Sequence, residues 1–116
     1  MAHLFSYAGA PWLTQKWVRK VKAAYCDVTP YGGYRDDEDQ GQMGALGVLM
    51  AIGLFEVDGG CAEKPFYEIT SPLFDKVTIH LDNRYYSGKT FQIITKGNST
   101  DNMYIQNASL MGKSGI

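Results

Sequence analysis

The sequence predicts an α+β fold in which two helices are followed by antiparallel strands. Apolar residues recur at helical spacing in residues 11–25, and residues 40–54 form an almost uncharged run of helical length. After residue 59 the pattern changes to the alternation of apolar and polar side chains that is typical of strands. We therefore expect a helical segment at 1–58 and a strand segment at 59–116.

The first predicted helix begins at Pro11, because the first helical position needs no backbone N–H. An apolar stripe at helical spacing predicts its core-facing side. The stripe consists of Leu13, Trp17, Val18, Val21, Ala24 and Tyr25. The basic residues Lys16, Arg19, Lys20 and Lys22 fall on other faces and predict a solvated surface. Trp12 is expected to pack, although its place at the helix edge also suits a binding site.

The second predicted helix has no charged residue from Gly41 to Phe55. A helix that is apolar all round is normally buried on every side, inside a large protein. The chain offers only one partner helix, so we expect the missing neighbours to come from a larger parent protein. The isolated chain is accordingly expected to expose apolar surface or to self-associate. Glycines within this run, such as Gly47 and Gly53, are expected to allow close approach of neighbouring segments.

Four short strands are predicted in the second half, at 66–70, 77–81, 91–95 and 103–106. Consecutive strands joined by short turns favour antiparallel pairing. Three or four strands cannot close a sandwich, so a second sheet is also expected from elsewhere. His80 falls on the polar side of its strand and is expected to be exposed.

The composition excludes several classes of protein. A chain of 116 residues with a net charge of −1 has no basic excess, so nucleic acid is not an expected partner. No apolar run is long enough to predict a membrane segment. Cys26 and Cys61 form neither a disulfide framework nor a zinc site, and His3 has no metal ligand nearby in sequence.

Four consecutive acids, Asp36 to Asp39, stand directly before the uncharged helical run. One interpretation is an acidic cap and first turn, which stabilises a helix by up to about 1 kcal/mol. The other is a set of carboxylates held and tuned for chemistry at the mouth of a buried helix. The charge pattern alone favours the cap.

Four motifs taken together change that balance. They are Tyr-Ala-Gly-Ala-Pro-Trp at 7–12, Asp-Glu-Asp-Gln-Gly-Gln-Met at 37–43, Tyr-Glu-Ile-Thr-Ser-Pro-Leu-Phe-Asp-Lys-Val at 67–77 and Gly-Lys-Thr-Phe at 88–91. In this order and spacing, the chain resembles the C-terminal part of glycoside hydrolase family 92. Members of that family are calcium-dependent, inverting exo-α-mannosidases.

The resemblance implies that this chain is an incomplete fragment of a secreted, periplasmic or cell-surface enzyme of several hundred residues. Residues 1–58 would belong to an (α/α)6 catalytic barrel and residues 59–116 to a β-sandwich. Asp39 matches the catalytic base and Asp37 the aspartate that assists it, whereas Asp36 stands where many members have glycine. The family's general acid, its Asn-Glu-Pro motif and most ligands of its calcium cofactor would lie before Met1. The implied substrate is an α-mannoside of N-glycans or mannans.

Two further interpretations stay open. An inverting glycosidase needs an acid and a base about 6.5–9.5 Å apart, so a chain with only the base is expected to be inactive alone. The main alternative is a non-catalytic carbohydrate-binding or structural module in which the acids only cap a helix. A glucoamylase-like helical-barrel enzyme of another specificity is a more distant alternative.

Overall fold

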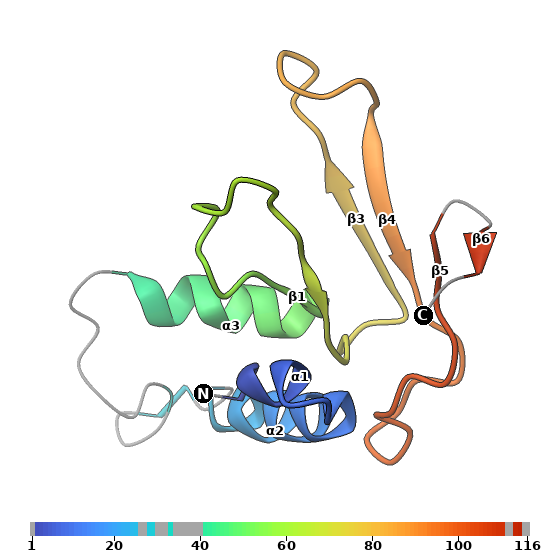
Figure 1. Ribbon diagram of the computed structural model, residues 1–116. Coiled ribbons are helices and arrows are strands. Elements are labelled where there is room, and N and C mark those ends of the chain that lie inside the picture. The colour runs from blue at the N-terminus through green and yellow to red at the C-terminus, as the bar shows by residue number, and fades with distance from the viewer. Residues whose placement is uncertain (1, 26–27, 30–32, 34–40, 111–112, 115–116) are drawn as a thin grey trace.

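The computed structural model describes residues 2–25, 28–29, 33, 41–110 and 113–114. The described part is α+β, with its helices gathered on one side and a long strand pair extending away from them (Figure 1). Its elements are α1 Leu4–Tyr7, α2 Pro11–Ala24, α3 Gln42–Ile52, β1 Leu54–Phe55, β2 Glu68–Ile69, β3 Lys76–His80, β4 Thr90–Ile94, β5 Ser109–Leu110 and β6 Lys113–Ser114.

The described strands pair antiparallel, as predicted, in three separate two-stranded sheets: β1 with β2, β3 with β4, and β5 with β6. In the longest pair, Val77 lies opposite Ile93 and Ile79 opposite Phe91. These four side chains are half-buried while their neighbours along each strand are exposed, so the predicted alternation is confirmed. His80 is exposed, also as predicted.

The predicted first helix is confirmed as α2, with proline at its start. Its predicted stripe is only partly correct, because Trp17 is 41% exposed while Thr14 and Gln15 are buried beside Val18. The short helix α1, which the sequence analysis did not predict, lies along α2, and the Ser6 hydroxyl donates a hydrogen bond to the Thr14 hydroxyl over 3.0 Å. Polar residues of α2 are therefore buried where distant segments supply partners.

Helix α3 is covered on one side only. Gly47, Met50 and Ala51 are buried, but Val48 is 61% exposed. One side of this helix is thus exposed, as expected for the chain on its own, and burial on every side stays a prediction for the larger parent protein. A methyl group at Gly47 would lie 3.7 Å from Tyr25, an ordinary contact, so the expected close approach is not found there.

The close approach occurs instead at Gly53, which ends α3. This glycine has a φ of 81°, and an added Cβ would lie 2.6 Å from Cγ of Pro72. Its carbonyl accepts a hydrogen bond of 2.8 Å from the Thr70 N–H, next to the β1–β2 pair. The turn at Gly53 thus brings the segment 70–72 directly against the end of α3, across the predicted boundary at residue 58.

Arg19 connects α2 to two distant loops. Its Nε donates to the carbonyl oxygen and the hydroxyl of Ser71 over 3.1 and 3.0 Å. Its Nη2 donates to the carbonyl oxygen of Pro72 and to Oδ1 of Asn98. Burial lowers the pKa of this guanidinium from its usual value. The prediction that Arg19 belongs to a solvated basic face is therefore wrong.

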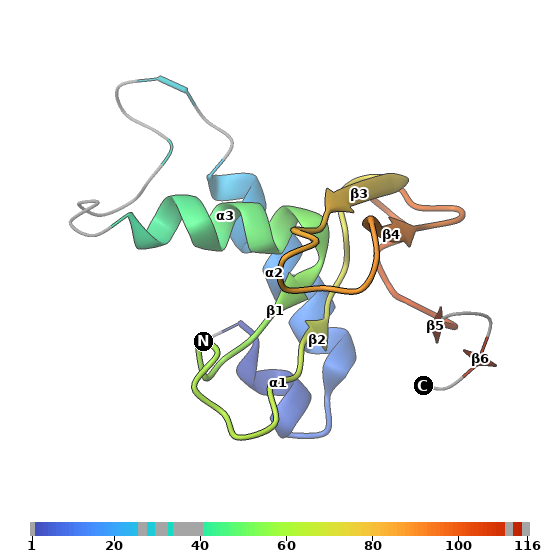
Figure 2. The same ribbon diagram turned by 90° about the horizontal axis from the view of Figure 1, so that it is seen from above.

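The predicted strand at 103–106 is wrong, because this segment has no strand partner in the structure. Its backbone is bonded to side chains instead. The Ser71 hydroxyl donates to the Met103 carbonyl oxygen over 2.6 Å, and the Ile105 N–H donates to Oε1 of Gln15 over 2.9 Å. The segment that leads from β4 to β5 (Figure 2) is therefore held to α2 and to Ser71 by hydrogen bonds.

The apolar core of the described residues is small. Val18, Met50 and Ala51 are the buried hydrophobic side chains, while Thr14, Thr70 and Ser71 are buried polar ones. The Cα radius of gyration is 15.1 Å, whereas a compact domain of this length has about 13 Å. The excess arises because β3 and β4 project away from the helices and do not cover them (Figure 1).

We predict that Arg19→Lys lowers the free energy of unfolding by about 2–3 kcal/mol. A lysine keeps the charge but cannot form the planar fork, and the oxygens of the two loops lose bonds to a charged donor. Urea denaturation measures the change. The reverse swap Lys20→Arg, at an exposed position of the same helix, should change stability by less than about 0.5 kcal/mol. Equal effects of the two swaps would contradict the role of Arg19.

We also predict that Gly53→Ala is much more destabilising than Gly59→Ala. Both glycines have positive φ, 81° and 61°, so both variants bear the backbone strain of about 1–2 kcal/mol. Only at Gly53 would the methyl group also clash with Pro72, whereas nothing lies within 4 Å at Gly59. We expect a further loss of about 1–3 kcal/mol for Gly53→Ala in urea denaturation. Similar losses for both variants would exclude the clash.

Candidate functional site

The predicted catalytic residues Asp37 and Asp39 lie outside the described residues, as does Asp36. In the sequence, the acidic segment lies between α2, which ends at Ala24, and α3, which begins at Gln42. Both of these helix ends are among the described residues.

Helix α3 begins without any acidic cap. Its N-cap residue is Gly41, with a φ of 73°, and no side chain caps the helix. The first turn contains no acidic residue, because α3 starts at Gln42 and not at residue 40 as predicted. The expectation of an acidic N-cap and first turn is therefore wrong. Any contact of the acids with the helix end lies outside the described residues.

A shallow hollow of about 220 Å³ lies between α2 and α3, near the ends that the acidic segment joins. Its lining residues are Lys22, Tyr25, Met43, Gly44, Gly47, Val48 and Ala51. Lys22 and Tyr25 are the two lining residues whose side chains carry a polar group. It is smaller than the pockets of about 300–1,000 Å³ that usually enclose a ligand. The described residues thus form a shallow hollow here and not a closed pocket.

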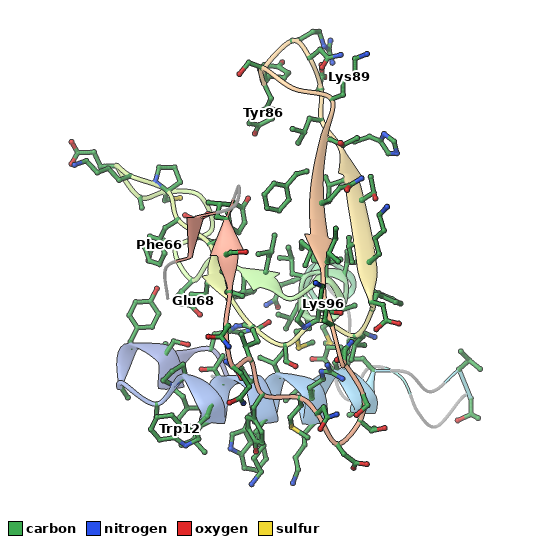
Figure 3. The ribbon with its side chains drawn as sticks, turned by 90° about the vertical axis from the view of Figure 1, so that its right-hand side faces the viewer. Trp12, Phe66, Glu68, Tyr86, Lys89 and Lys96 are labelled. Carbon is green, nitrogen blue, oxygen red and sulfur yellow. The ribbon has the colours of Figure 1, made fainter. Side chains whose placement is uncertain are left out.

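A buried polar pair lies between α1 and the β1–β2 sheet. Nδ1 of His3 is 3.8 Å from Oε2 of Glu68, and the two residues are only 5% and 8% exposed. The His3 ring stacks on Phe55 with 3.8 Å between ring centroids. Figure 3 shows Glu68 between the helices and the strands, with Phe66 further out on the same segment. Sequence analysis missed this pair, because 65 positions separate His3 from Glu68 and no local sequence pattern links the two residues.

Burial favours the neutral form of both members of this pair. It lowers the pKa of His3 to about 4. It also raises the pKa of Glu68, although the Tyr7 hydroxyl lowers the pKa of Glu68 by a smaller amount. Loss of solvent, and then the Glu68 carboxylate, raise the pKa of Tyr7 to about 12. A carboxyl group kept protonated can serve as a general acid. Here, however, neither His3 nor Glu68 lines either of the two described pockets, so we assign the pair a structural role.

The described residues do not form a metal site. No group of three His, Cys, Asp or Glu side chains is found among them. Calcium takes six to eight oxygen ligands, and Asp37 and Asp39 could supply only a few of these. The predicted calcium cofactor therefore has no fitting site in the described part of the chain.

None of the helices in that part is long and apolar enough to cross a membrane.

Comparison with known proteins identifies the class of this protein as a glycoside hydrolase. Residues 1–115 match the model of the glycosyl hydrolase family 92 catalytic domain. The match covers almost the whole sequence, so the chain belongs to glycoside hydrolase family 92. A search of curated proteins found no match. Family membership implies a glycosidase that acts on a glycan, and it confirms the resemblance drawn from the four sequence motifs.

We predict that His3 makes the folded chain less stable as the pH falls from 6.5 to about 4. In this window the unfolded chain binds a proton at His3 that the folded chain does not bind. The free energy of unfolding therefore decreases as the pH is lowered. Compared with His3→Gln, the native chain should lose about 1–2 kcal/mol of its free energy of unfolding across the window. This loss is smaller than the one that the full pKa shift would correspond to. Urea denaturation at several pH values measures this difference.

The raised pKa of Glu68 acts with the opposite sign, because the folded chain then holds the proton more tightly than the unfolded chain. The contribution of Glu68 is present in both the native chain and His3→Gln. The difference between the two proteins in how the free energy of unfolding changes with pH therefore reports on His3 alone. His80→Gln, on the exposed side of β3, is the matched control. A pH slope in His3→Gln equal to that of the native chain would contradict the prediction.

Proposed function

We propose that this chain supplies the catalytic base of an inverting exo-α-mannosidase. The observation that carries the proposal is the family 92 match over residues 1–115, which includes the acidic motif at 37–43. The start of α3 is compatible with it, because the helix begins at Gln42 after a glycine N-cap and its first turn contains no acid.

In the proposed reaction, Asp39 accepts a proton from the water that attacks the anomeric carbon, on the face opposite the leaving group. Asp37, two residues earlier, orients or tunes Asp39. A general acid protonates the departing glycosidic oxygen, and we propose that it comes from a segment outside residues 1–116. A carboxyl pair formed by neighbours in sequence would leave no room for the attacking water. We therefore propose that this chain does not turn over substrate alone.

Calcium is part of the same proposal, with most of its ligands contributed by the rest of the enzyme. When bound, the ion would supply positive charge that holds oxygen atoms of the sugar. We also propose that the parent enzyme acts outside the cytoplasm, where N-glycans or mannans are available. The exposed side of α3 and the unpaired edges of β3 and β4 support packing against further protein.

We predict that Asp39→Asn in the longer enzyme lowers kcat/KM by about 10²–10⁴-fold without lowering the Tm by more than a few degrees. The amide is nearly isosteric with the carboxylate but cannot accept the proton of the attacking water. Asp37→Asn should cost less activity, and Asp36→Asn least. The measurement is kcat/KM on an aryl α-mannoside beside the Tm for each of the three variants.

Two outcomes contradict the proposal. If Asp39→Asn keeps near-native kcat/KM while its Tm falls, Asp39 has a structural role and is not the base. If the purified 116-residue chain hydrolyses the aryl mannoside and a calcium chelator abolishes this activity, the general acid cannot lie outside the chain. Mannose binding without any hydrolase activity in the longer protein would favour the non-catalytic carbohydrate-binding module.

A further inference from the structure

A second hollow lies at the start of α2, where the returning segment 103–106 passes the helix. Its volume is about 420 Å³, which is within the range that holds small ligands. It is lined by Pro11, Trp12, Gln15, Tyr104, Ile105 and Gln106. None of these side chains is charged. The hollow therefore has no charged side chain to pair with a phosphate, a carboxylate or a cation, and it suits a neutral ligand.

Two aromatic side chains at this hollow remain open to solvent. Trp12 is 54% exposed and Tyr104 is 43% exposed. The expectation that Trp12 packs is therefore wrong, and in Figure 3 its side chain points away from β3 and β4 on the outer side of the helices. Large aromatic rings carry a strong drive toward burial, and their faces give a flat apolar platform. Two exposed rings at one hollow provide such a platform for a ligand.

Two amide side chains supply the polar part of the hollow. Oε1 of Gln15 accepts the Ile105 N–H over 2.9 Å, which fixes this largely buried amide in place. The amide nitrogen of Gln15 donates to no partner among the described residues. Gln106 is exposed, and its Nε2 donates to the Tyr104 carbonyl oxygen over 3.2 Å, so its Oε1 can still accept. Fixed amides offer both donors and acceptors, which is what the hydroxyl groups of a sugar need.

We propose that this hollow binds a neutral hexopyranose unit of the glycan substrate. The apolar C–H face of the sugar ring lies on Trp12 and Tyr104, and its hydroxyl groups bond to Gln15 and Gln106. The choice of a mannose-containing glycan rests on the proposed function. The hollow lies at the start of α2, whereas Lys22 and Tyr25 of the smaller hollow stand at the other end of this helix, which is about 20 Å long. No carboxylic acid lines the hollow beside Trp12, so we assign it to holding the glycan and not to bond cleavage.

Tryptophan fluorescence tests the proposal directly. The chain has two tryptophans, Trp12 and Trp17, so a Trp17→Phe background reports on Trp12 alone. Methyl α-mannopyranoside and an α-linked mannobiose are titrated into this protein. We expect a saturable change in emission with a Kd on the order of millimolar, and tighter binding of the disaccharide. A change that rises linearly without saturation, or that glycerol at the same concentration reproduces, overturns the proposal.

Matched variants locate the response. In the Trp17→Phe background, Tyr104→Ala should weaken binding at least tenfold, and Gln106→Ala several-fold. Tyr85→Ala removes an aromatic ring that is 77% exposed but lies on the loop between β3 and β4, so it should leave the Kd unchanged. Circular dichroism of each variant verifies its fold. A Kd that is the same in Tyr104→Ala, or that is weakened equally by Tyr85→Ala, overturns the proposal.

The binding measurement needs no turnover, so its failure is distinct from failure of the proposed function. If the longer enzyme hydrolyses α-mannosides while Trp12 does not respond to the sugars, the hollow is not a sugar site and the proposed function stands. If Trp12 responds and Tyr104→Ala removes the response, the hollow is a sugar site even where no hydrolysis is found. Asp39→Asn should leave the Kd unchanged, and loss of the response in that variant would place the bound sugar elsewhere.

Discussion

The arrangement of this chain depends on the hydrogen bonds of one guanidinium group. Arg19 reaches from the middle of α2 to Ser71 and Pro72 on one side and to Asn98 on the other. The planar fork of arginine can serve several oxygen acceptors at once, which a lysine cannot do. Because Ser71 in turn bonds to the Met103 carbonyl oxygen, the same cluster determines where the returning segment lies. The hollow beside Trp12 exists only because that segment passes the start of α2.

A second constraint is the scarcity of buried apolar side chains. With Val18, Met50 and Ala51 as the buried hydrophobic residues among those described, hydrophobic burial contributes little to holding the segments together. Polar contacts between segments far apart in sequence take over this role. The side chains of the buried pair of His3 and Glu68 make no hydrogen bond among the described residues, and burial disfavours the charged form of each group, so the pair does not take part in this role. Several large apolar side chains, Trp12 and Val48 among them, stay exposed.

The family match and the geometry of α3 bear on different parts of the functional argument. The match covers residues 1–115 and identifies the chain as a member of glycoside hydrolase family 92. The start of α3 at Gln42, after a glycine N-cap, separates the acidic motif from the helix itself. The helix itself thus begins without an acid in its first turn, and the role proposed for the acids rests on the sequence motif.

The sequence alone determined the features that depend on neighbours along the chain. Pro11 and the helical spacing after it predicted α2, the alternation at 77–81 and 91–95 predicted the β3–β4 pair, and the four motifs predicted the family. The roles of Asp37 and Asp39 also come from the motif and remain predictions. Tertiary structure decided what depends on partners far away in sequence. The spacing of Arg19 could indicate only a face of a helix, because Ser71 and Asn98 lie 52 and 79 positions away. The same holds for the exposure of Trp12, the pairing of His3 with Glu68, and the segment 103–106, whose strand-like pattern was overridden by side-chain acceptors and donors on α2 and near β2.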